Sequence, residues 1–219
     1  MSITIAGQTF NADVKKINLN KQNIVDITPL QPLINLEFLA LEENQIADVT
    51  PLRALTNLTF LSLCHNQISD ITSLKTLTKL TLVSFWDNQI SDIAPLQYLT
   101  NLKELGLGSN KVSDLKPLQS LTKLAETDLE HNKISDVTPL RTMVSLSKLY
   151  LSDNLIEDVS PLQTLVNLTE LGLYENKITD VTPLYSLKKL KKLELRGNPL
   201  TNEQIEDLRC ELPNCEIIL

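Results

Sequence analysis

The sequence predicts an α/β solenoid, built from stacked copies of one short unit and closed at its C-terminal end by a helix. The unit contains the pattern Asn-x-Ile-x-Asp-x-x-Pro-Leu, which recurs with a step of 22 residues and without insertions. The copies begin at Asn44, Asn66, Asn88, Asn110, Asn132, Asn154 and Asn176, with variants at Gln22 and Asn198. The leucines before each asparagine alternate with polar residues, as on a half-buried strand. A fixed period of this length is typical of solenoids.

Each unit is expected to begin with a short strand. Leu39 and Leu41 alternate with polar residues, so both should face the core. The same two positions recur as Leu61/Leu63, Val83/Phe85, Leu105/Leu107, Leu149/Leu151, Leu171/Leu173 and Leu193/Leu195. Thr127 takes one of these leucine positions. Its replacement by Val or Leu should stabilise the fold, unless a backbone carbonyl accepts its hydroxyl proton.

The residues after each strand predict a turn and then a short 3₁₀ helix or extended segment. Stacked asparagine side chains both donate and accept, so they are expected to satisfy the backbone groups of the turn. An aspartate recurs from Asp26 to Asp180 in steps of 22. We expect it to accept hydrogen bonds from nearby backbone amides, which explains every copy better than a metal or acid/base role. The proline that follows in most copies disfavours a long helix.

Both ends of the repeat array have the features of caps. Residues 3–10 predict a short edge strand and a turn, with Phe10 and Val14 covering the first repeat. Thr201 followed by Gln204 resembles a capping box that opens a helix through about residue 212. The period then places three residues on the leucine positions of a tenth repeat: Leu212, Cys215 and Ile217. We expect one domain over 1–219, with an N-terminal cap (1–16), repeats (17–198), and a C-terminal cap helix and last strand (199–219).

Composition argues against several classes of function. The net charge of −7 disfavours nucleic-acid binding, which needs a basic surface. No apolar run reaches the roughly 20 residues that insertion into a membrane requires. The first residues lack the features of a signal peptide, so the expected compartment is the cytoplasm by default, and the exterior or the cell surface if a leader was removed. Cys64, Cys210 and Cys215 have no metal-binding spacing. A Cys210–Cys215 disulfide stays open, and we expect no metal or other cofactor.

The full pattern, Leu-x-x-Leu-x-Leu-x-x-Asn-x-Ile-x-Asp-x-x-Pro-Leu, resembles the leucine-rich repeat of the 22-residue class. That class occurs in bacterial internalins and in a eukaryotic phosphatase-regulating subunit. The resemblance covers roughly residues 14–205. It implies a curved solenoid with a parallel sheet on its concave face, used for protein binding. Internalins also have a signal peptide and a helical N-terminal cap, which this sequence does not show, so secretion and host-cell adhesion are not carried over.

Phe85 and Trp86 are adjacent, so only one of them can face the core. Phe85 stands on a leucine position, and Trp86 is therefore expected to point outward from the concave sheet. Its neighbours there predict a mixed binding surface. The apolar patch consists of Phe38, Phe60, Leu82, Cys64 and Trp86, together with Ala40. Gly106 and Gly108 leave a dip beside Trp86. The acidic strip consists of Glu104, Glu126, Asp128 and Glu130. Tyr150 and Tyr174 form a second aromatic pair.

These residues predict a module that binds a partner protein or peptide with apolar and basic features, because exposed aromatic clusters usually mark interaction sites. In the plainer alternative, Phe38 and Phe60 only pack on each other across strands. Another alternative function is structural, with the patch buried in a homodimer, although we expect a monomer.

An enzyme is disfavoured by the sequence. Cys64, His65 and Asp87 contain the residue types of a nucleophile, a base and an orienting acid. Adjacent residues on a strand diverge, however, and no glycine loop for an oxyanion hole is visible. His131 should lie roughly 14 Å from His65, too far to share a metal ion.

Overall fold

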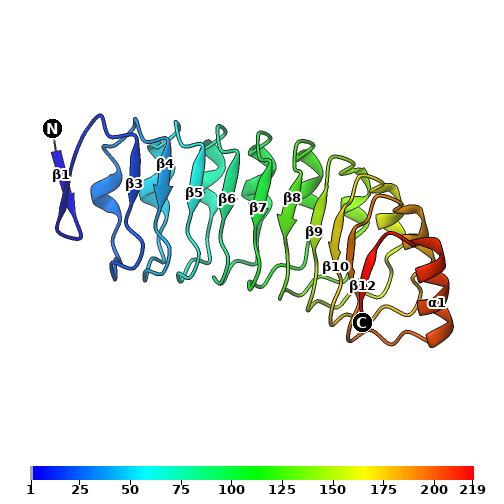
Figure 1. Cartoon of the computed structure of the whole chain (residues 1–219). Helices are drawn as coiled ribbons and strands as arrows, with labels where there is room; N and C mark the ends of the chain where they lie inside the picture. Colours follow the sequence, from blue (N-terminus) through cyan, green and yellow to red (C-terminus); the bar gives the residue numbers. More distant parts are fainter. Residues whose placement is uncertain (1) are drawn as a thin grey trace.

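The structure is a computed structural model that describes residues 2–219, and it confirms the predicted curved α/β solenoid. Within these residues, one sheet of 10 parallel strands runs in chain order from β3 to β12 (Figure 1). Its strands are β3 (Lys16–Asn18), β4 (Phe38–Ala40), β5 (Phe60–Ser62), β6 (Leu82–Ser84), β7 (Glu104–Gly106), β8 (Glu126–Asp128), β9 (Lys148–Tyr150), β10 (Glu170–Gly172), β11 (Lys192–Glu194) and β12 (Glu216–Ile218).

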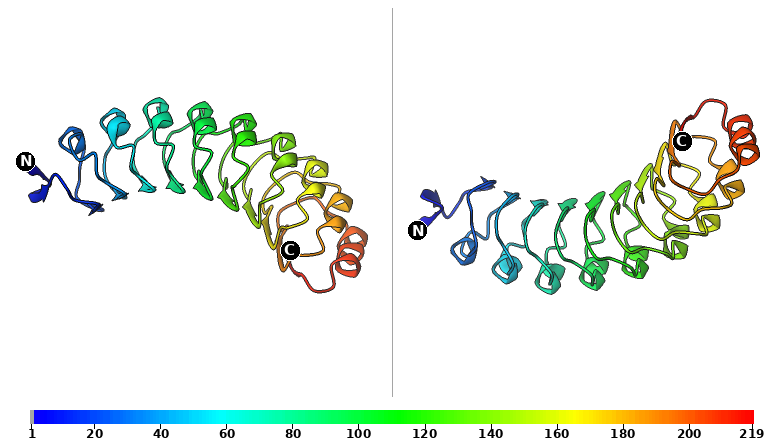
Figure 2. Two further views of the ribbon diagram at one scale, coloured as in Figure 1. Left: turned by 90° about the horizontal axis from the view of Figure 1, so that it is seen from above. Right: turned by 90° about the horizontal axis from the view of Figure 1, so that it is seen from below.

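The strands line the inner side of the arc and 3₁₀ helices line its outer side (Figure 2). The helices are η1 (Thr28–Leu30), η2 (Thr50–Ala54), η3 (Thr72–Thr76), η4 (Ala94–Tyr98), η5 (Lys116–Ser120), η6 (Thr138–Thr142), η7 (Ser160–Thr164) and η8 (Thr182–Ser186). Paired strands lie about 4.8 Å apart, whereas packed helical segments need about 8–10 Å. The outer side therefore spreads, and the sheet becomes the concave face.

The core consists of the leucine positions of every repeat. Leu39, Leu41 and Phe85 are fully buried, and neighbouring strands pair with a step of one repeat, such as Leu39 with Leu61. One cluster of buried side chains extends from Ile3 to Leu212. Because each repeat buries its leucines only against its neighbours, the stability of the array depends on stacking.

The asparagines form the predicted ladder, with buried side chains at Asn44, Asn88, Asn110, Asn154 and Asn176 and half-buried ones at Asn66, Asn132 and Asn198. Asn110 accepts the backbone N–H of Ile90 through Oδ1 (2.9 Å). Its Nδ2 donates to the carbonyl oxygens of Phe85, Leu107 and Gly108 at 2.9, 3.1 and 3.1 Å. One side chain thus satisfies backbone groups of two repeats, which explains why an amide is needed at this position.

The aspartates have the predicted turn-capping role. Asp48 Oδ1 accepts the N–H of Thr50 at 2.8 Å, and the other copies from Asp26 to Asp180 make the same bond. The following 3₁₀ helix begins at that residue, so each aspartate fixes the start of one convex turn.

Thr127 differs from the simplest expectation. Its side chain is fully buried, but its hydroxyl donates to the carbonyl oxygen of Leu105 at 3.1 Å. A backbone carbonyl therefore accepts the hydroxyl proton of Thr127, so Thr127→Val and Thr127→Leu are not expected to stabilise the fold. The neighbouring strand supplies the acceptor because the two repeats are stacked in register.

The N-terminal cap is a β-hairpin of β1 (Ser2–Ile5) and β2 (Gln8–Asn11), which pair antiparallel. Ile3 and Ile5 are buried, and Phe10 and Val14 pack partly buried against the core. The expected covering of the first repeat is therefore present, with two strands in place of one.

The C-terminal cap contains α1 (Asn202–Glu211), which begins with the predicted capping box between Thr201 and Gln204. The predicted register of the last strand was wrong. Ile217, and not Cys215, pairs with Leu193, so two additional residues lie before the strand. Cys210 and Cys215 are free thiols. No helix in the described part of the chain is long and apolar enough to cross a membrane.

Candidate binding surface on the concave face

The apolar patch begins with an aromatic stack. The rings of Phe38 and Phe60, on β4 and β5, lie 4.2 Å apart between centroids and are nearly parallel, at 9°. Both side chains are half-buried. The cross-strand packing of the plainer alternative is thus present, and it leaves one shared apolar surface toward the concavity.

Trp86 lies just beyond the end of β6 and is half-buried. Its ring meets that of His65 edge-on, with centroids 5.0 Å apart. The indole also lies over Gly108, since a Cβ on Gly108 would collide with the ring. The expected dip at Gly108 is therefore filled by Trp86 itself.

At Gly106 the Ser84 hydroxyl narrows the dip, since it would lie 2.6 Å from a Cβ there. A shallow hollow of ≈ 260 Å³ remains, lined by apolar residues and by three carboxylates. The lining residues are Leu82, Val83, Ser84, Glu104, Leu105, Gly106, Glu126 and Asp128. The apolar patch and the acidic strip therefore meet at one hollow on the sheet.

A lysine outside the predicted binding surface partly neutralises the acidic strip. Lys148 Nζ lies 3.4 Å from Glu126 Oε2 and 3.7 Å from Glu170 Oε1. Asp128 is half-buried, and its Oδ1 accepts the N–H of Glu130 at 3.0 Å. Burial raises the pKa of the Asp128 carboxyl, against the effect of that hydrogen bond, and the nearby Glu130 charge adds to the rise.

Tyr150 and Tyr174 are engaged with different neighbours. The Tyr150 hydroxyl donates to Glu170 Oε2 at 2.6 Å. The guanidinium of Arg196 lies over the Tyr174 ring, 4.8 Å from its centroid. Both contacts follow the spacing of the repeats and could have been found in the sequence. Arg196 lies one repeat after Tyr174, and Glu170 lies on the strand next to Tyr150, diagonally beside it.

The model of the family described as "Leucine Rich repeats (2 copies)" matches residues 56–98, 78–122, 100–141 and 166–210. The chain belongs to the leucine-rich repeat family. No curated protein sequence matches it.

Solved structures of this family resemble the chain over most of its length. An internalin, InlF, from Listeria monocytogenes is 33% identical with a TM-score of 0.89, covering 97% of this chain and 63% of that one. Internalin C2 from the same organism is 35% identical with a TM-score of 0.78, covering 85% and 80%. The functional domain of InlJ from that organism, which includes a cysteine ladder, is 25% identical with a TM-score of 0.72, covering 92% and 48%. The chain thus spans less than two thirds of the InlF structure.

Leucine-rich repeat proteins in general are scaffolds for protein–protein interaction rather than enzymes. In this chain, His65 Nδ1 does lie 2.9 Å from Asp87 Oδ2. The Cys64 thiol is directed elsewhere, with Sγ 3.0 Å from the Ser84 hydroxyl and 3.6 Å from that of Ser62. His131 makes a separate pair with Asp153 at 2.6 Å. Among residues 2–219, no three His, Cys, Asp or Glu side chains are grouped as metal ligands.

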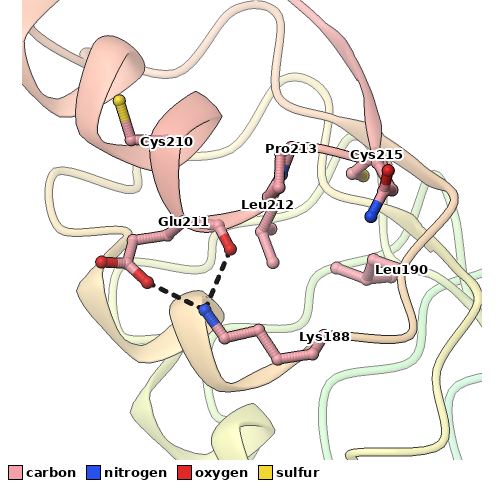
Figure 3. Close-up of a pocket in the computed structure, with 8 residues that line it drawn as sticks. Lys188, Leu190, Cys210, Glu211, Leu212, Pro213 and Cys215 are labelled. Atoms are coloured by element: carbon pink, nitrogen blue, oxygen red, sulfur yellow. Dashed lines mark hydrogen bonds and ion pairs between the residues drawn. The ribbon is translucent and has the colours of Figure 1, made fainter.

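A second hollow, of ≈ 340 Å³, lies in the C-terminal cap of the leucine-rich repeat, away from the concave face (Figure 3). Lys188 Nζ donates there to the carbonyl oxygen of Glu211 (2.9 Å) and to its carboxylate (2.8 Å). These bonds satisfy the last turn of α1 and hold it against the preceding repeat. Cys210 and Cys215 lie on opposite sides of this hollow (Figure 3).

Proposed function

We propose that the concave face binds a partner protein or peptide, centred on Trp86 and on the hollow at Gly106. The apolar patch would contribute burial, and the acidic strip would favour a partner segment with Lys or Arg. The observation on which this proposal depends most is the position of Trp86. Its half-buried ring covers Gly108, where Asp128 Oδ1 also approaches, and Asp128 is one of the carboxylates that line the hollow. Aromatic anchors beside such hollows are typical of binding hot spots.

Charge supports the same assignment. Glu104 and Glu126 line the hollow together with Asp128, and the whole chain has a net charge of −7. A basic segment would approach this face faster than a neutral one, and the effect would decline with salt. The stacked Phe38 and Phe60 rings would offer an apolar surface about 10 Å or more from the acidic side of the hollow, given the spacing of strands.

The experiment is capture of partners from the source organism's lysate, with Trp86→Ala as the comparison. A captured partner is then titrated against the parent and variants. Trp86→Ala should weaken binding strongly without loss of the fold. Asp128→Lys with Glu130→Lys should slow association more than it speeds dissociation. Gln97→Ala and Gln119→Ala, on the convex side, should leave the affinity unchanged.

Burial of the patch in a homodimer is the alternative occupant. Mass measurement over a range of concentrations separates the two. A monomer at high micromolar concentration agrees with partner binding. A dimer that Trp86→Ala dissociates would replace the partner with a second copy of the chain.

A further inference from the structure

Ser152 is a buried hydroxyl that lacks a hydrogen-bond partner. It is 3% exposed. Within residues 2–219, its Oγ is the one buried side-chain oxygen or nitrogen that lacks a hydrogen-bond partner. Thr127, also fully buried, does find a carbonyl acceptor. Leaving such a group unpaired destabilises the folded chain, because its hydrogen bonds to water are lost without replacement. Ser152 therefore either only destabilises the fold or forms its hydrogen bond with a polar group of a bound partner.

The hydroxyl points toward the space over Gly172, which neighbouring side chains cover in the free chain. A Cβ placed on Gly172 would lie 3.0 Å from Ser152 Oγ, 3.4 Å from the edge of the Tyr150 ring and 3.5 Å from Glu130 Oε1. A hydroxyl, a carboxylate and an aromatic ring thus converge over a residue with no side chain. We call this group, with Tyr174, the Ser152 notch: Glu130, Tyr150, Ser152, Gly172 and Tyr174.

Glu130, Ser152 and Tyr174 form one row across the sheet, because they occupy the same position in three successive repeats. Backbone bonds from His131 to Ser152 and from Asp153 to Tyr174 keep the turns after β8, β9 and β10 in step. The backbones of Glu130 and Tyr174 then lie on either side of the small Ser152, about 10 Å apart along the row. The Glu130 carboxylate reaches into this interval, since its Oε1 would lie 3.5 Å from a Cβ on Gly172. A planar cation would therefore enter between Glu130 and Tyr174 only as that carboxylate turns to meet it.

The local electrostatics favour a cation. Burial, the bond to Glu170 and the charges of Glu170, Glu126 and Glu130 all raise the pKa of the Tyr150 hydroxyl. The charges of Glu126 and Glu170 raise the pKa of Lys148. Lys148 pairs with those two carboxylates, and among the ion pairs of the described residues none involves Glu130. The same row already contains one cation–π contact, in which the guanidinium of Arg196 lies over the Tyr174 ring.

We propose that the Ser152 notch receives the guanidinium of an arginine side chain from the bound partner. This inference rests on the proposed function and specifies the basic feature of the partner. The guanidinium would donate to Glu130 and to Ser152 Oγ and would stack on the tyrosine side of the notch. The Tyr150 ring and the Glu130 carboxylate cover Gly172 in the free chain, so both would have to change rotamer, with the carboxylate remaining within hydrogen-bond distance of the guanidinium. The new hydrogen-bond partner of Ser152 would offset part of that cost.

Arginine fits this geometry better than lysine. Its planar group donates in several directions at once and stacks on aromatic faces, whereas an ammonium is a compact and strongly hydrated charge. The arrangement of Arg196 on Tyr174 is a precedent within the same row.

The test is an amide NMR titration of the full chain with N-acetyl-arginine amide, with N-acetyl-lysine amide and N-acetyl-citrulline amide as comparisons. We expect saturable shifts at the amides of Ser152, Gly172 and Tyr174 with the arginine probe. The lysine probe should bind at least about three-fold more weakly, and the neutral citrulline probe should not saturate. Glu130→Gln and Ser152→Ala should each weaken arginine binding. Glu157→Gln, an exposed carboxylate outside both the notch and the acidic strip, should not.

The free spectra of the variants establish that they are folded. Absence of saturable shifts at the notch, equal affinity for arginine and lysine, or indifference to both Glu130→Gln and Ser152→Ala would overturn the inference. A partner whose affinity falls with Trp86→Ala but not with Glu130→Gln would overturn it too, and would leave the proposed function intact.

Discussion

The indole of Trp86 occupies the space over Gly108 that a side chain on Gly108 would need. Gly108 thus leaves room for the Trp86 ring, which belongs to the preceding repeat. This pairing explains how a large apolar side chain is held half-buried on an otherwise open sheet, where it is oriented before any partner arrives.

Gly108→Ala should therefore displace Trp86 while the backbone stays folded. Because the chain has a single tryptophan, acrylamide quenching of its fluorescence measures the exposure of this ring alone. We expect stronger quenching in Gly108→Ala. Gly106→Ala is the control, since its Cβ would meet the Ser84 hydroxyl at 2.6 Å, and that side chain can rotate. Equal quenching in Gly108→Ala and the parent would refute the contact.

The two buried hydroxyls should respond in opposite directions. Thr127→Val removes a bond to the Leu105 carbonyl and should lower the free energy of unfolding by about 1 kcal/mol. Ser152→Ala removes a hydroxyl without a partner and should raise it by about 1 kcal/mol. Urea denaturation midpoints measure both. A higher midpoint for Thr127→Val together with a lower midpoint for Ser152→Ala would contradict this prediction.

The asparagine ladder should depend on burial. Asn132 accepts the Val112 N–H at 2.9 Å and donates to three carbonyls, so Asn132→Ala should cost about 1–3 kcal/mol. Asn101, an exposed asparagine, bonds the Thr78 carbonyl at 2.9 Å, and Asn101→Ala should cost under about 0.5 kcal/mol. Gln22→Asn, in a terminal repeat, should be close to neutral. Equal midpoints for Asn132→Ala and the parent would exclude a stabilising ladder.

The pH dependence should separate two kinds of aspartate. The hydrogen bonds with Thr138 lower the pKa of Asp136. Asp136 thus contributes stability above the pKa of the unfolded chain, and this contribution is lost as pH falls through the lower folded pKa. Burial raises the pKa of Asp128, so its ionised form costs stability at neutral pH, and the cost disappears as pH falls through the raised folded pKa.

Asp128→Asn should therefore stabilise the chain at pH 7 and lose that advantage in acid, since the amide oxygen can still accept the Glu130 N–H. Asp136→Asn should destabilise at pH 7 and lose that penalty in acid. Thermal unfolding at a series of pH values measures both, and parallel curves for the two variants would contradict this assignment.

The repeat period was sufficient to predict the strands, the ladder and the aspartate caps, because every copy repeats the same local chemistry. It failed at the last strand. Leu212, Cys215 and Ile217 fit the apolar spacing, but the segment after α1 adds two residues, and Ile217 pairs with Leu193 instead. An apolar pattern does not distinguish a register from one displaced by two residues, because the side-chain period of a strand is two.

The composition of the surface followed from the sequence, but its shape did not. The rows placed Trp86 beside Gly108, yet the sequence does not specify the rotamer that fills the space over the glycine. Lys148 and Arg196 were visible on the same rows, but their pairing with Glu126 and Tyr174 depends on side-chain directions across strands. The acceptor of Thr127 likewise comes from a residue 22 positions away.

Partner binding by the concave face is tested most directly by the dissociation constants of a captured partner for the parent, Trp86→Ala and Gln97→Ala. We expect Trp86→Ala to weaken binding about 30-fold, corresponding to about 2 kcal/mol for a buried aromatic anchor. Gln97→Ala, on the convex face, should bind as the parent does. An affinity that is unchanged in Trp86→Ala but falls in the convex variant would contradict a concave binding site.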